Sequence, residues 1–335
     1  MTRPQRPLIS VVLSFRNEAD NIPTLAARLD KMFATQDVEY ELLFVNDAST
    51  DASLPLLLDE RQHNTRIRIV NLSRRFGVAE GVIAGMAISR GDAVVYMDAD
   101  LQDPPEVIPG LIDRWRQGAD VVHTVRTQRH GENPLKMAAT RLAYRLIQFG
   151  SSIELPVDAG DFKLLSRPAV DHLLRLRESD PYLRGLVVWI GFNQVCIPYE
   201  RDSRHAGRTH FPFFSRNPWK TFTTGLTSFS FMPIYVCFAL ATAGLVVALL
   251  LALAGSAFMA ALTFFWATTI GAIAVIGTYL IRVYKDVRGR PPYIIESVIG
   301  GEPGAAWGNG VSQAGGAARG EGARATNEES GSRSR

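Results

Sequence analysis

The sequence predicts an α/β fold, in which a domain with a mostly parallel sheet is followed by two apolar helices. Between residues 8 and 200, segments rich in Val, Ile and Phe alternate with amphipathic segments, an order typical of parallel sheets covered by helices. Polar clusters follow several of the strand-like segments, and a long stretch without charged residues follows the domain. Ligands of parallel sheets bind at the carboxyl ends of strands, so the clusters indicate where a site would lie.

Five strands and four helices are expected in the first part of the chain. The expected strands are Ile9–Phe15, Glu41–Asn46, Ile67–Leu72, Ala93–Asp98 and Asp120–Val125. A further strand, Val195–Tyr199, is expected near the end of the domain. The expected helices are Ile22–Phe33, Ala52–Gln62, Val78–Ser89 and Pro105–Gln117. Asp20 and Asp51 precede the first two helices, and we expect them to act as N-caps.

The fourth strand ends in two carboxylates, Asp98 and Asp100, and the pair Pro104-Pro105 follows. Proline lacks the backbone donor that a strand needs, so the strand ends here. Because side chains alternate along a strand, Asp98 and Asp100 project from the same face. Like charges this close need a compensating cation or hydrogen-bond donors, and Mg²⁺ is commonly held by one or two carboxylates plus substrate phosphates. An acidic turn is the alternative.

Polar clusters after neighbouring strands favour a binding site over a simple acidic turn. In a parallel sheet the carboxyl ends of these strands meet at one edge. The clusters are Arg16-Asn17-Glu18, Asn46-Asp47, Ser73-Arg74-Arg75 and Asp98-Ala99-Asp100.

The charge-free stretch runs from Thr221 to Ile281 and is long enough for two membrane helices of about 20 residues each. We expect these helices at residues 231–254 and 262–281; a hairpin buried in a soluble protein is the alternative. Basic residues flank the pair, whereas the turn between the helices is uncharged. The positive-inside rule therefore places the N-terminal domain and both termini in the cytoplasm.

The remaining segments have less distinctive patterns. Residues 1–210 form the expected domain, and residues 211–230 mix aromatics with Arg216 and Lys220, which favours an interfacial helix over a plain linker. Residues 300–335 are rich in Gly, Ala and Ser without periodicity, so a disordered cytoplasmic tail is expected.

Overall composition excludes several classes of protein. The two cysteines, Cys196 and Cys237, lie in strand-like and apolar segments, which argues against a disulfide framework. The net charge of +3 gives no indication of nucleic-acid binding, and we expect no nucleic-acid partner. No signal peptide is evident, because the only apolar run near residue 8 is short and strand-like.

Three motifs, in this order and spacing, resemble the signatures of family 2 glycosyltransferases, which implies a GT-A nucleotide-sugar-binding fold for the domain. They are Ile9–Glu18 (ISVVLSFRNE), Leu43–Asp51 (LFVNDASTD) and Asp98–Pro105 (DADLQDPP). Residues 71–77, residues 160–163 and the two apolar helices further resemble the polyprenyl-phosphate glycosyltransferases, including dolichol-phosphate mannose synthases and bacterial glucosyl carriers. The resemblance covers residues 8–290.

On the donor side, the resemblance implies four nucleotide-sugar contacts besides Asp98. Asp47 would read the nucleotide base, and Glu18 and Arg74 would lie on the nucleotide side. Arg204 belongs to a loop that resembles one closing over the diphosphate.

The resemblance also implies a divalent cation held by Asp98, Asp100 and Gln102, with Asp98 beside the ribose as well. Their oxygen atoms suit Mg²⁺ or Mn²⁺, and no cluster of His and Cys indicates zinc. The ion would act as a Lewis acid on the leaving nucleoside diphosphate, so Asp100 is counted among the catalytic residues.

On the acceptor side, a basic segment at residues 126–140 follows the fifth strand. Lys136 and Thr140 are four residues apart and share a helix face. The resemblance implies that Arg126, Lys136 and Thr140 bind a lipid phosphate; a solvated basic face is the alternative.

Asp161 is the active-site carboxylate that the resemblance implies. A phosphate monoester has a second pKa of about 6 and is mostly dianionic at neutral pH, so the acceptor needs no base. The charged acceptor favours a role for Asp161 in orienting the substrates, and a role as a base is the alternative. Two positions depart from the family pattern: His210 stands where lysine is common, and Arg75 where asparagine is usual.

The sequence thus predicts a membrane-bound, metal-dependent, inverting hexosyltransferase. It would transfer a sugar from UDP-glucose to undecaprenyl phosphate at the cytoplasmic face of a bacterial inner membrane, with GDP-mannose and UDP-N-acetylhexosamine as alternative donors. A processive polysaccharide synthase is disfavoured because Val188, not Arg, precedes Trp189. A non-catalytic membrane scaffold is the last alternative, and the helix pair is compatible with a homo-oligomer.

Overall fold

The computed structural model describes residues 4–127, 159–201, 228, 232–253 and 258–300. The strands are β1 (Leu8–Phe15), β2 (Glu39–Asn46), β3 (Ile67–Leu72), β4 (Ala93–Asp98), β5 (Val121–Arg126), β6 (Ala159–Ser166), β7 (Gln194–Tyr199) and β8 (Ile295–Ile299). The helices are α1 (Ile22–Phe33), α2 (Ser53–His63), α3 (Val78–Ile88), the 3₁₀ helix η1 (Pro105–Val107), α4 (Ile108–Arg116), α6 (Arg167–Leu173), α7 (Leu183–Trp189), α9 (Met232–Leu253) and α10 (Phe258–Val287). All predicted strands and helices of the first part are found, with ends shifted by at most two residues. The helix predicted at Pro105–Gln117 begins as the 3₁₀ helix η1 and continues as α4.

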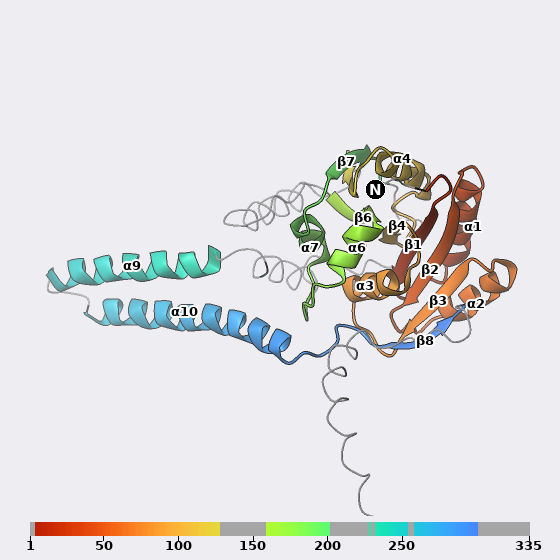
Figure 1. Cartoon of the computed structure of the whole chain (residues 1–335). Coiled ribbons are helices and arrows are strands. Elements are labelled where there is room, and N and C mark those ends of the chain that lie inside the picture. The colour runs from red at the N-terminus through yellow and green to blue at the C-terminus, as the bar shows by residue number, and fades with distance from the viewer. Residues whose placement is uncertain (1–3, 128–158, 202–227, 229–231, 254–257, 301–335) are drawn as a thin grey trace, which may run out of the picture. The chain divides into compact units, whose positions relative to one another are not determined.

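One sheet joins all the described strands, in the order β7-β5-β6-β4-β1-β2-β3-β8 (Figure 1). Strands β1 to β5 and β7 run in one direction, and β6 and β8 run in the other. The predicted α/β fold with a mostly parallel sheet is therefore confirmed.

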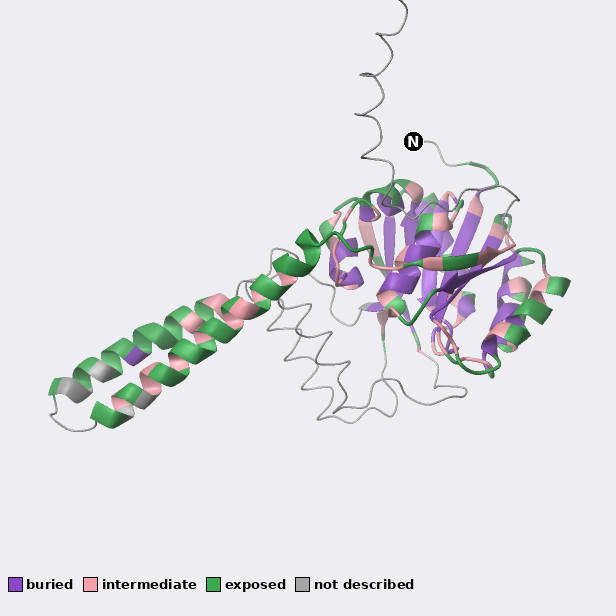
Figure 2. Cartoon of the chain, turned by 90° about the horizontal axis from the view of Figure 1, so that it is seen from below, coloured by how far each residue is buried: buried purple, intermediate pink, exposed green. Residues whose placement is uncertain are grey.

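Helices cover both faces of the sheet, and β1 shows how the sequence achieves this. Val11 and Leu13 belong to the apolar cluster with α1, α2 and α4, whereas Val12 belongs to the cluster with α3, α6 and α7. A strand buried on both faces must be apolar at every position, which explains its continuous apolar run. Figure 2 shows the strands of the sheet as largely buried.

The predicted helix caps are only partly found. Helix α1 starts after Asn21, without a side-chain cap hydrogen bond, so Asp20 is not its N-cap. Helix α2 starts after Ala52, and Asp51 lies one residue earlier than a cap. Even so, Asp51 Oδ1 accepts a hydrogen bond from the Ser53 N–H at 3.1 Å, because an aspartate can bond the backbone two residues on.

The apolar region forms two helices, α9 and α10, close to the predicted positions. The Phe264 ring occupies the space that a side chain at Gly244 would need, so this glycine lets the two helices pack closely. Among the described residues, one segment, Phe264–Val287, is long and apolar enough to cross a membrane. In α9 the described apolar stretch, Pro233–Val247, is shorter than a membrane span requires. Two membrane spans are therefore not confirmed, and the second remains a proposal.

Strands β6 and β8 do not appear among the strands that the sequence predicts. Strand β8 follows α10 and pairs antiparallel with β3. Its Ser297 Oγ accepts a hydrogen bond from Asn71 Nδ2, and Asn71 Oδ1 accepts one from Asn46 Nδ2, both at 3.0 Å. The chain that leaves α10 is thus bonded to the sheet beside the carboxyl end of β2.

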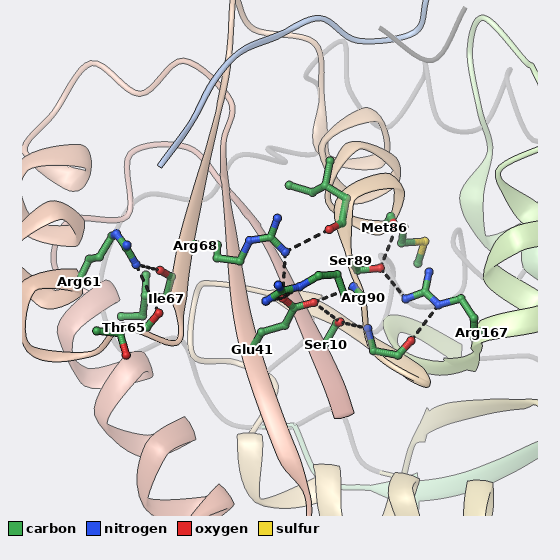
Figure 3. A network of polar contacts seen from close by, with 12 residues as sticks. Ser10, Glu41, Arg61, Thr65, Ile67, Arg68, Met86, Ser89, Arg90 and Arg167 are labelled. Atoms are coloured by element: carbon green, nitrogen blue, oxygen red, sulfur yellow. Dashed lines mark hydrogen bonds and ion pairs between the residues drawn. The ribbon is translucent and has the colours of Figure 1, made fainter. Parts of the chain in front are cut away.

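A buried ion pair links β2 to β3 near the amino ends of the strands, opposite the carboxyl ends where the polar clusters lie (Figure 3). Glu41 Oε1 accepts hydrogen bonds from Ser10 Oγ at 2.6 Å and from the Arg90 N–H at 2.8 Å. Glu41 Oε2 accepts one from Arg68 Nη1 at 2.9 Å, and both side chains are almost fully buried. Burial alone would raise the pKa of Glu41, but these hydrogen bonds and the Arg68 charge lower it below its ordinary value of 4.5.

Replacing Glu41 by glutamine is expected to lower the free energy of unfolding by about 3 kcal/mol, because it leaves the buried Arg68 charge without its partner. The matched control is Arg90→Gln: the Arg90 side chain is 56% exposed, so its loss should cost no more than about 1 kcal/mol. Denaturant unfolding of the purified protein measures both. Equal effects of the two variants would contradict this account.

The same ion pair predicts a pH dependence of stability. The pKa of Glu41 is lowered in the folded state, so its contribution is fully present above the ordinary pKa of 4.5 and is lost as the pH falls through the lowered value. The Glu41→Gln variant should therefore differ from the wild type at pH 7 and approach it under acid conditions.

Candidate functional site

The carboxyl ends of β1 to β4 lie at one edge of the sheet. Their register aligns Ser14 with Asp98, Phe15 with Asn46, and Asn46 with Asn71. The polar clusters that follow these strands are thereby brought together. Glu18, Asp47, Arg74 and Asp98, all predicted as site residues, follow or end these strands at this edge.

Asp47 is buried and shapes the loop after β3. Its Oδ1 accepts a hydrogen bond from the Phe76 N–H at 2.6 Å. Arg16 Nη1 donates to the Asp47 backbone oxygen at 2.8 Å and to that of Ala48 at 2.5 Å. Hydrogen bonds therefore join the turn after β1 to the turn after β2, and Asp47 joins the loop after β3 to both.

Glu18 and Arg74 come from two different turns of this edge. Glu18 is half-buried; its N–H donates to Ser53 Oγ at 2.9 Å, and its Oε2 accepts from Asn21 Nδ2 at 2.6 Å. Arg74 is exposed, and its guanidinium lies 4.0 Å from the centre of the Phe76 ring. The structure thus places Arg74 on the loop that Asp47 orders.

Backbone strain is concentrated at this edge. Of the described residues other than glycine, four have a positive φ: Asn17, Ala48, Leu101 and Phe192. The first three directly neighbour Glu18, Asp47 and Asp100 in the sequence. Such conformations cost about 1–3 kcal/mol each and cluster at functional sites, which supports this edge as the site. No sequence pattern indicated them.

Asp100 and Gln102 form a tight turn after β4. Asp100 is buried, and its Oδ1 accepts a hydrogen bond from the Gln102 N–H at 3.2 Å. Leu101, between them, has φ +60°. The turn therefore fixes Asp100 relative to Gln102, whereas Asp98, at the strand end, is half-buried.

The carboxylates at this edge repel one another. Burial is the main reason that the pKa of Asp98 is raised to about 7. The neighbouring charges of Asp161, Asp103 and Asp100 act in the same direction. Arg201 opposes them. Asp98 thus lies among like charges, and a bound cation would offset their repulsion.

Asp161 lies on β6, on the same face of the sheet as Asp98. The β4–β6 register aligns Tyr96 with Lys163, so its continuation brings Asp98 opposite Asp161. Arg184, from α7, donates from Nε to Asp161 Oδ1 at 2.7 Å and from Nη2 to Oδ2. Burial would raise the pKa of Asp161, but Arg184 above all lowers it well below the ordinary value of 3.8. Asp161 is therefore a firmly ionised carboxylate and a weak base.

Lys163 lies two residues after Asp161 on β6, on the same face of the sheet, and is almost fully buried. Its Nζ donates to the Gly160 backbone oxygen and lies 5.8 Å from the centre of the Tyr96 ring. Burial lowers the pKa of Lys163 to about 8, partly offset by the charge of Asp161. This lysine adds a positive charge beneath Asp161.

Arg126, predicted to bind the acceptor, ends β5 and contacts Tyr199 at the end of β7. Its Nε donates to the Tyr199 hydroxyl at 3.3 Å, and that hydroxyl donates to Asp103 Oδ1 at 2.5 Å. Arg201 Nε lies 3.2 Å from the same Asp103 oxygen. Burial and the Asp103 charge raise the pKa of Tyr199 to about 12, so its hydroxyl stays protonated.

The remaining predicted site residues, Lys136, Thr140 and Arg204, lie outside the described residues. Conversely, Asp103, Arg184 and Tyr199 are absent from the predicted site residues. Arg184 and Tyr199 carry no motif, and only the fold brings them to the site. Asp103 lies inside the DADLQDPP motif, which was a signal that could have identified it.

Comparison with known proteins identifies the family. A family model described as "Glycosyl transferase family 2" matches residues 10–174. Among solved structures, the mannosyltransferase PcManGT from Pyrobaculum calidifontis, in complex with GDP-Man and Mn²⁺, is 17% identical with a TM-score of 0.46, covering 85% of this chain and 88% of that one.

Two curated relatives are much more similar in sequence. The uncharacterized glycosyltransferase YkcC of Bacillus subtilis (strain 168) is 36% identical over 305 residues, which cover 87% of this chain and 94% of YkcC. The bactoprenol glucosyl transferase of Shigella phage SfII is 31% identical over 315 residues, which cover 88% of this chain and 99% of that protein. The family model and the relatives all indicate a glycosyltransferase, and the chain belongs to glycosyl transferase family 2.

Proposed function

We propose that this glycosyltransferase transfers a hexose from a nucleotide sugar to a polyprenyl phosphate at the inner face of a bacterial membrane. The observation that carries the proposal is the arrangement of charges at one sheet edge. Asp98 and Asp100 lie beside Asp161, whose negative charge is held by Arg184, and Arg126 lies close by. Carboxylates for a metal–diphosphate complex and cations for a second phosphate thus occur together. The name of the Shigella phage SfII relative supports a polyprenyl acceptor.

On the donor side, Asp47, Glu18 and Arg74 would bind the nucleotide, with Arg204 closing over the diphosphate. The residues after β4 fit a divalent cation. Burial above all, and then the charges of Asp161, Asp103 and Asp100, raise the pKa of Asp98, and a cation would offset the repulsion among these carboxylates.

In the described ranges, no group of three or more His, Cys, Asp or Glu side chains is placed to hold a metal ion by itself. Asp98, Asp100 and Gln102 would therefore share Mg²⁺ or Mn²⁺ with the donor phosphates. Proteins commonly bind such hard cations through one or two carboxylates together with substrate phosphates. When bound, the ion supplies Lewis acidity to the leaving diphosphate.

On the acceptor side, the nucleophile is a phosphate oxygen. It would form a bond to the anomeric carbon while the nucleoside diphosphate leaves from the opposite face, which inverts the configuration. Because the acceptor is already an anion and the pKa of Asp161 is lowered, Asp161 orients the substrates rather than removing a proton. Arg126, with Lys136 and Thr140, would bind the acceptor phosphate, so catalysis rests on positioning and charge neutralisation.

The acceptor is a membrane lipid, which the helices α9 and α10 would reach. Figure 2 shows the described parts of both helices as largely exposed. The exposed large apolar side chains include Phe238 and Leu245 on α9 and Trp266 and Leu280 on α10. Apolar surface on this scale indicates contact with lipid or protein. We propose that both helices span the membrane, with both termini in the cytoplasm and residues 211–230 at the interface.

Transfer of radiolabel from a panel of nucleotide sugars to lipid tests this function. The purified protein, with Mg²⁺ and undecaprenyl phosphate in vesicles, should give lipid-extractable label from UDP-glucose and lose it when EDTA removes the metal. GDP-mannose and UDP-N-acetylhexosamine are the competing donors. Absence of lipid label from every donor would overturn the proposal.

A further inference from the structure

We propose that Asp103 is a positioning residue that holds Arg126 and Arg201 together as a clamp for one phosphate group, that of the acceptor. The inference rests on the function proposed above and deepens it. It assigns roles to Asp103, Tyr199 and Arg201, which neither the sequence motifs nor the geometry of the metal site explains.

The centre of the clamp is a fully buried carboxylate. Asp103 is 0% exposed, and its Oδ1 is the shared contact of the Tyr199 hydroxyl and of Arg201 Nε. Its Oδ2 is buried without a hydrogen-bond partner. A buried charge is costly unless it is paired, so a carboxylate kept here must compensate nearby cations. The available cations are Arg201 directly and Arg126 through Tyr199.

The contacts also determine how the two arginines point. Arg126 is held through Nε by the Tyr199 hydroxyl, and Arg201 faces Asp103 through Nε. These contacts leave the planar terminal groups, which recognise phosphate with two parallel bonds, to other partners. Arg126 Nη2 lies over Gly160, 3.1 Å from the position that a Cβ would take there. Gly160 directly precedes Asp161 in the chain, so this arginine lies near Asp161.

The sheet order favours the acceptor over the donor as the source of this phosphate. Arg126 and Tyr199 end β5 and β7, whereas Asp47 and Glu18 follow β2 and β1. Strand β4, which ends at Asp98, lies between the two groups. The residues proposed to bind the nucleotide and the clamp therefore lie on opposite sides of Asp98. Transfer of a sugar from a donor phosphate to an acceptor phosphate would require such an arrangement.

Two variants test the clamp. Tyr199→Phe removes the hydroxyl between Asp103 and Arg126, and Asp103→Asn keeps an oxygen acceptor but removes the charge that faces Arg201. Each should raise the KM for undecaprenyl phosphate about tenfold, the loss expected for one misplaced charge-assisted hydrogen bond. The KM for the nucleotide sugar should stay within about twofold. Inorganic phosphate, used as a soluble probe, should inhibit the wild type more strongly than either variant.

A matched control is Tyr40→Phe. Tyr40 also donates its hydroxyl to an aspartate, Asp30 Oδ1 at 2.9 Å, but it lies near the start of β2. Its loss should leave both KM values unchanged. A clamp variant that raises the KM for the nucleotide sugar instead would assign the phosphate to the donor and overturn the acceptor clamp. A lower Tm with both KM values unchanged would show a purely structural role and overturn it too.

Binding of vesicles that contain undecaprenyl phosphate separates this inference from the proposed function. If the wild type binds these vesicles more tightly than the clamp variants but transfers no sugar, the proposed function fails and the clamp stands. If the wild type transfers sugar and the variants match it in binding and KM, the clamp fails and the function stands.

Discussion

Replacing Asp100 by asparagine is expected to lower kcat about a thousandfold. Asp100 is buried, and its Oδ1 accepts the Gln102 N–H. Asparagine keeps that oxygen, so the turn should persist while the negative charge is lost. The metal–diphosphate complex would then lose one of its proposed carboxylates. Single-turnover transfer to lipid, with thermal unfolding measured in parallel, gives the rate and checks the fold.

Asp92→Asn is the matched control for this substitution. Asp92 also accepts a backbone hydrogen bond, from the Leu8 N–H at 2.9 Å, but it lies at the opposite end of β4. Its replacement should leave kcat nearly unchanged. Metal-dependent, wild-type-like turnover in the Asp100 variant would show that the metal is held elsewhere.

Replacing Arg184 by glutamine is expected to lower kcat/KM about a hundredfold, because Asp161 loses the two hydrogen bonds that align it. The pH profile should also change. In the wild type the pKa of Asp161 is lowered below its ordinary value of 3.8, so this carboxylate stays ionised at every pH above that value. Without Arg184, its pKa rises, and activity should fall further on the acid side.

The pH dependence of kcat/KM, measured for the wild type and for Arg184→Gln, checks this account. The control variant is Arg175→Gln, because Arg175 is exposed and is not among the proposed site residues. A profile for Arg184→Gln that parallels the wild type would contradict the role of Arg184 in holding Asp161 ionised.

The strands that could be predicted were those with continuous apolar runs. Strands β1 and β4 are buried on both faces, so Val11, Val12 and Val95 mark them in the sequence. Strand β6 alternates instead: Asp161 and Lys163 lie on the same face of the sheet as Asp98, whereas Phe162 and Leu164 lie in the core on the other face. That alternation is a strand signal, but four residues are too short a pattern to separate a strand from a polar motif.

Strand β8 is harder to predict because it is short and far from its partner in the sequence. Ser297 and Asn71 are 226 positions apart, and only the completed fold shows that they bond. The helical region was predicted at nearly the right place, although α10 starts at Phe258 rather than at Leu262 and extends to Val287. Its last turns are charged, and for that reason an apolar run could not reveal them.

The residues at the ends of the strands were predicted because a parallel sheet gathers them regardless of side-chain detail. Their partners could not be predicted in the same way. Arg184 reaches Asp161 from α7, and Tyr199 reaches Asp103 across 96 positions. Such pairs depend on how helices and strands pack, which no local pattern encodes. Arg184 also lowers the pKa of Asp161, which supports the proposed role of Asp161 in orienting the substrates over that of a base.

The most direct test of the central claim compares two acceptors that differ only in the phosphate. Labelled donor, Mg²⁺ and the full-length protein in vesicles are incubated either with undecaprenyl phosphate or with free undecaprenol. The account predicts one labelled sugar per lipid with the phosphate and no labelled lipid with the alcohol. Equal labelling of the alcohol, or label in a growing polymer, would contradict a charged acceptor held by Arg126 and a transfer that needs no base.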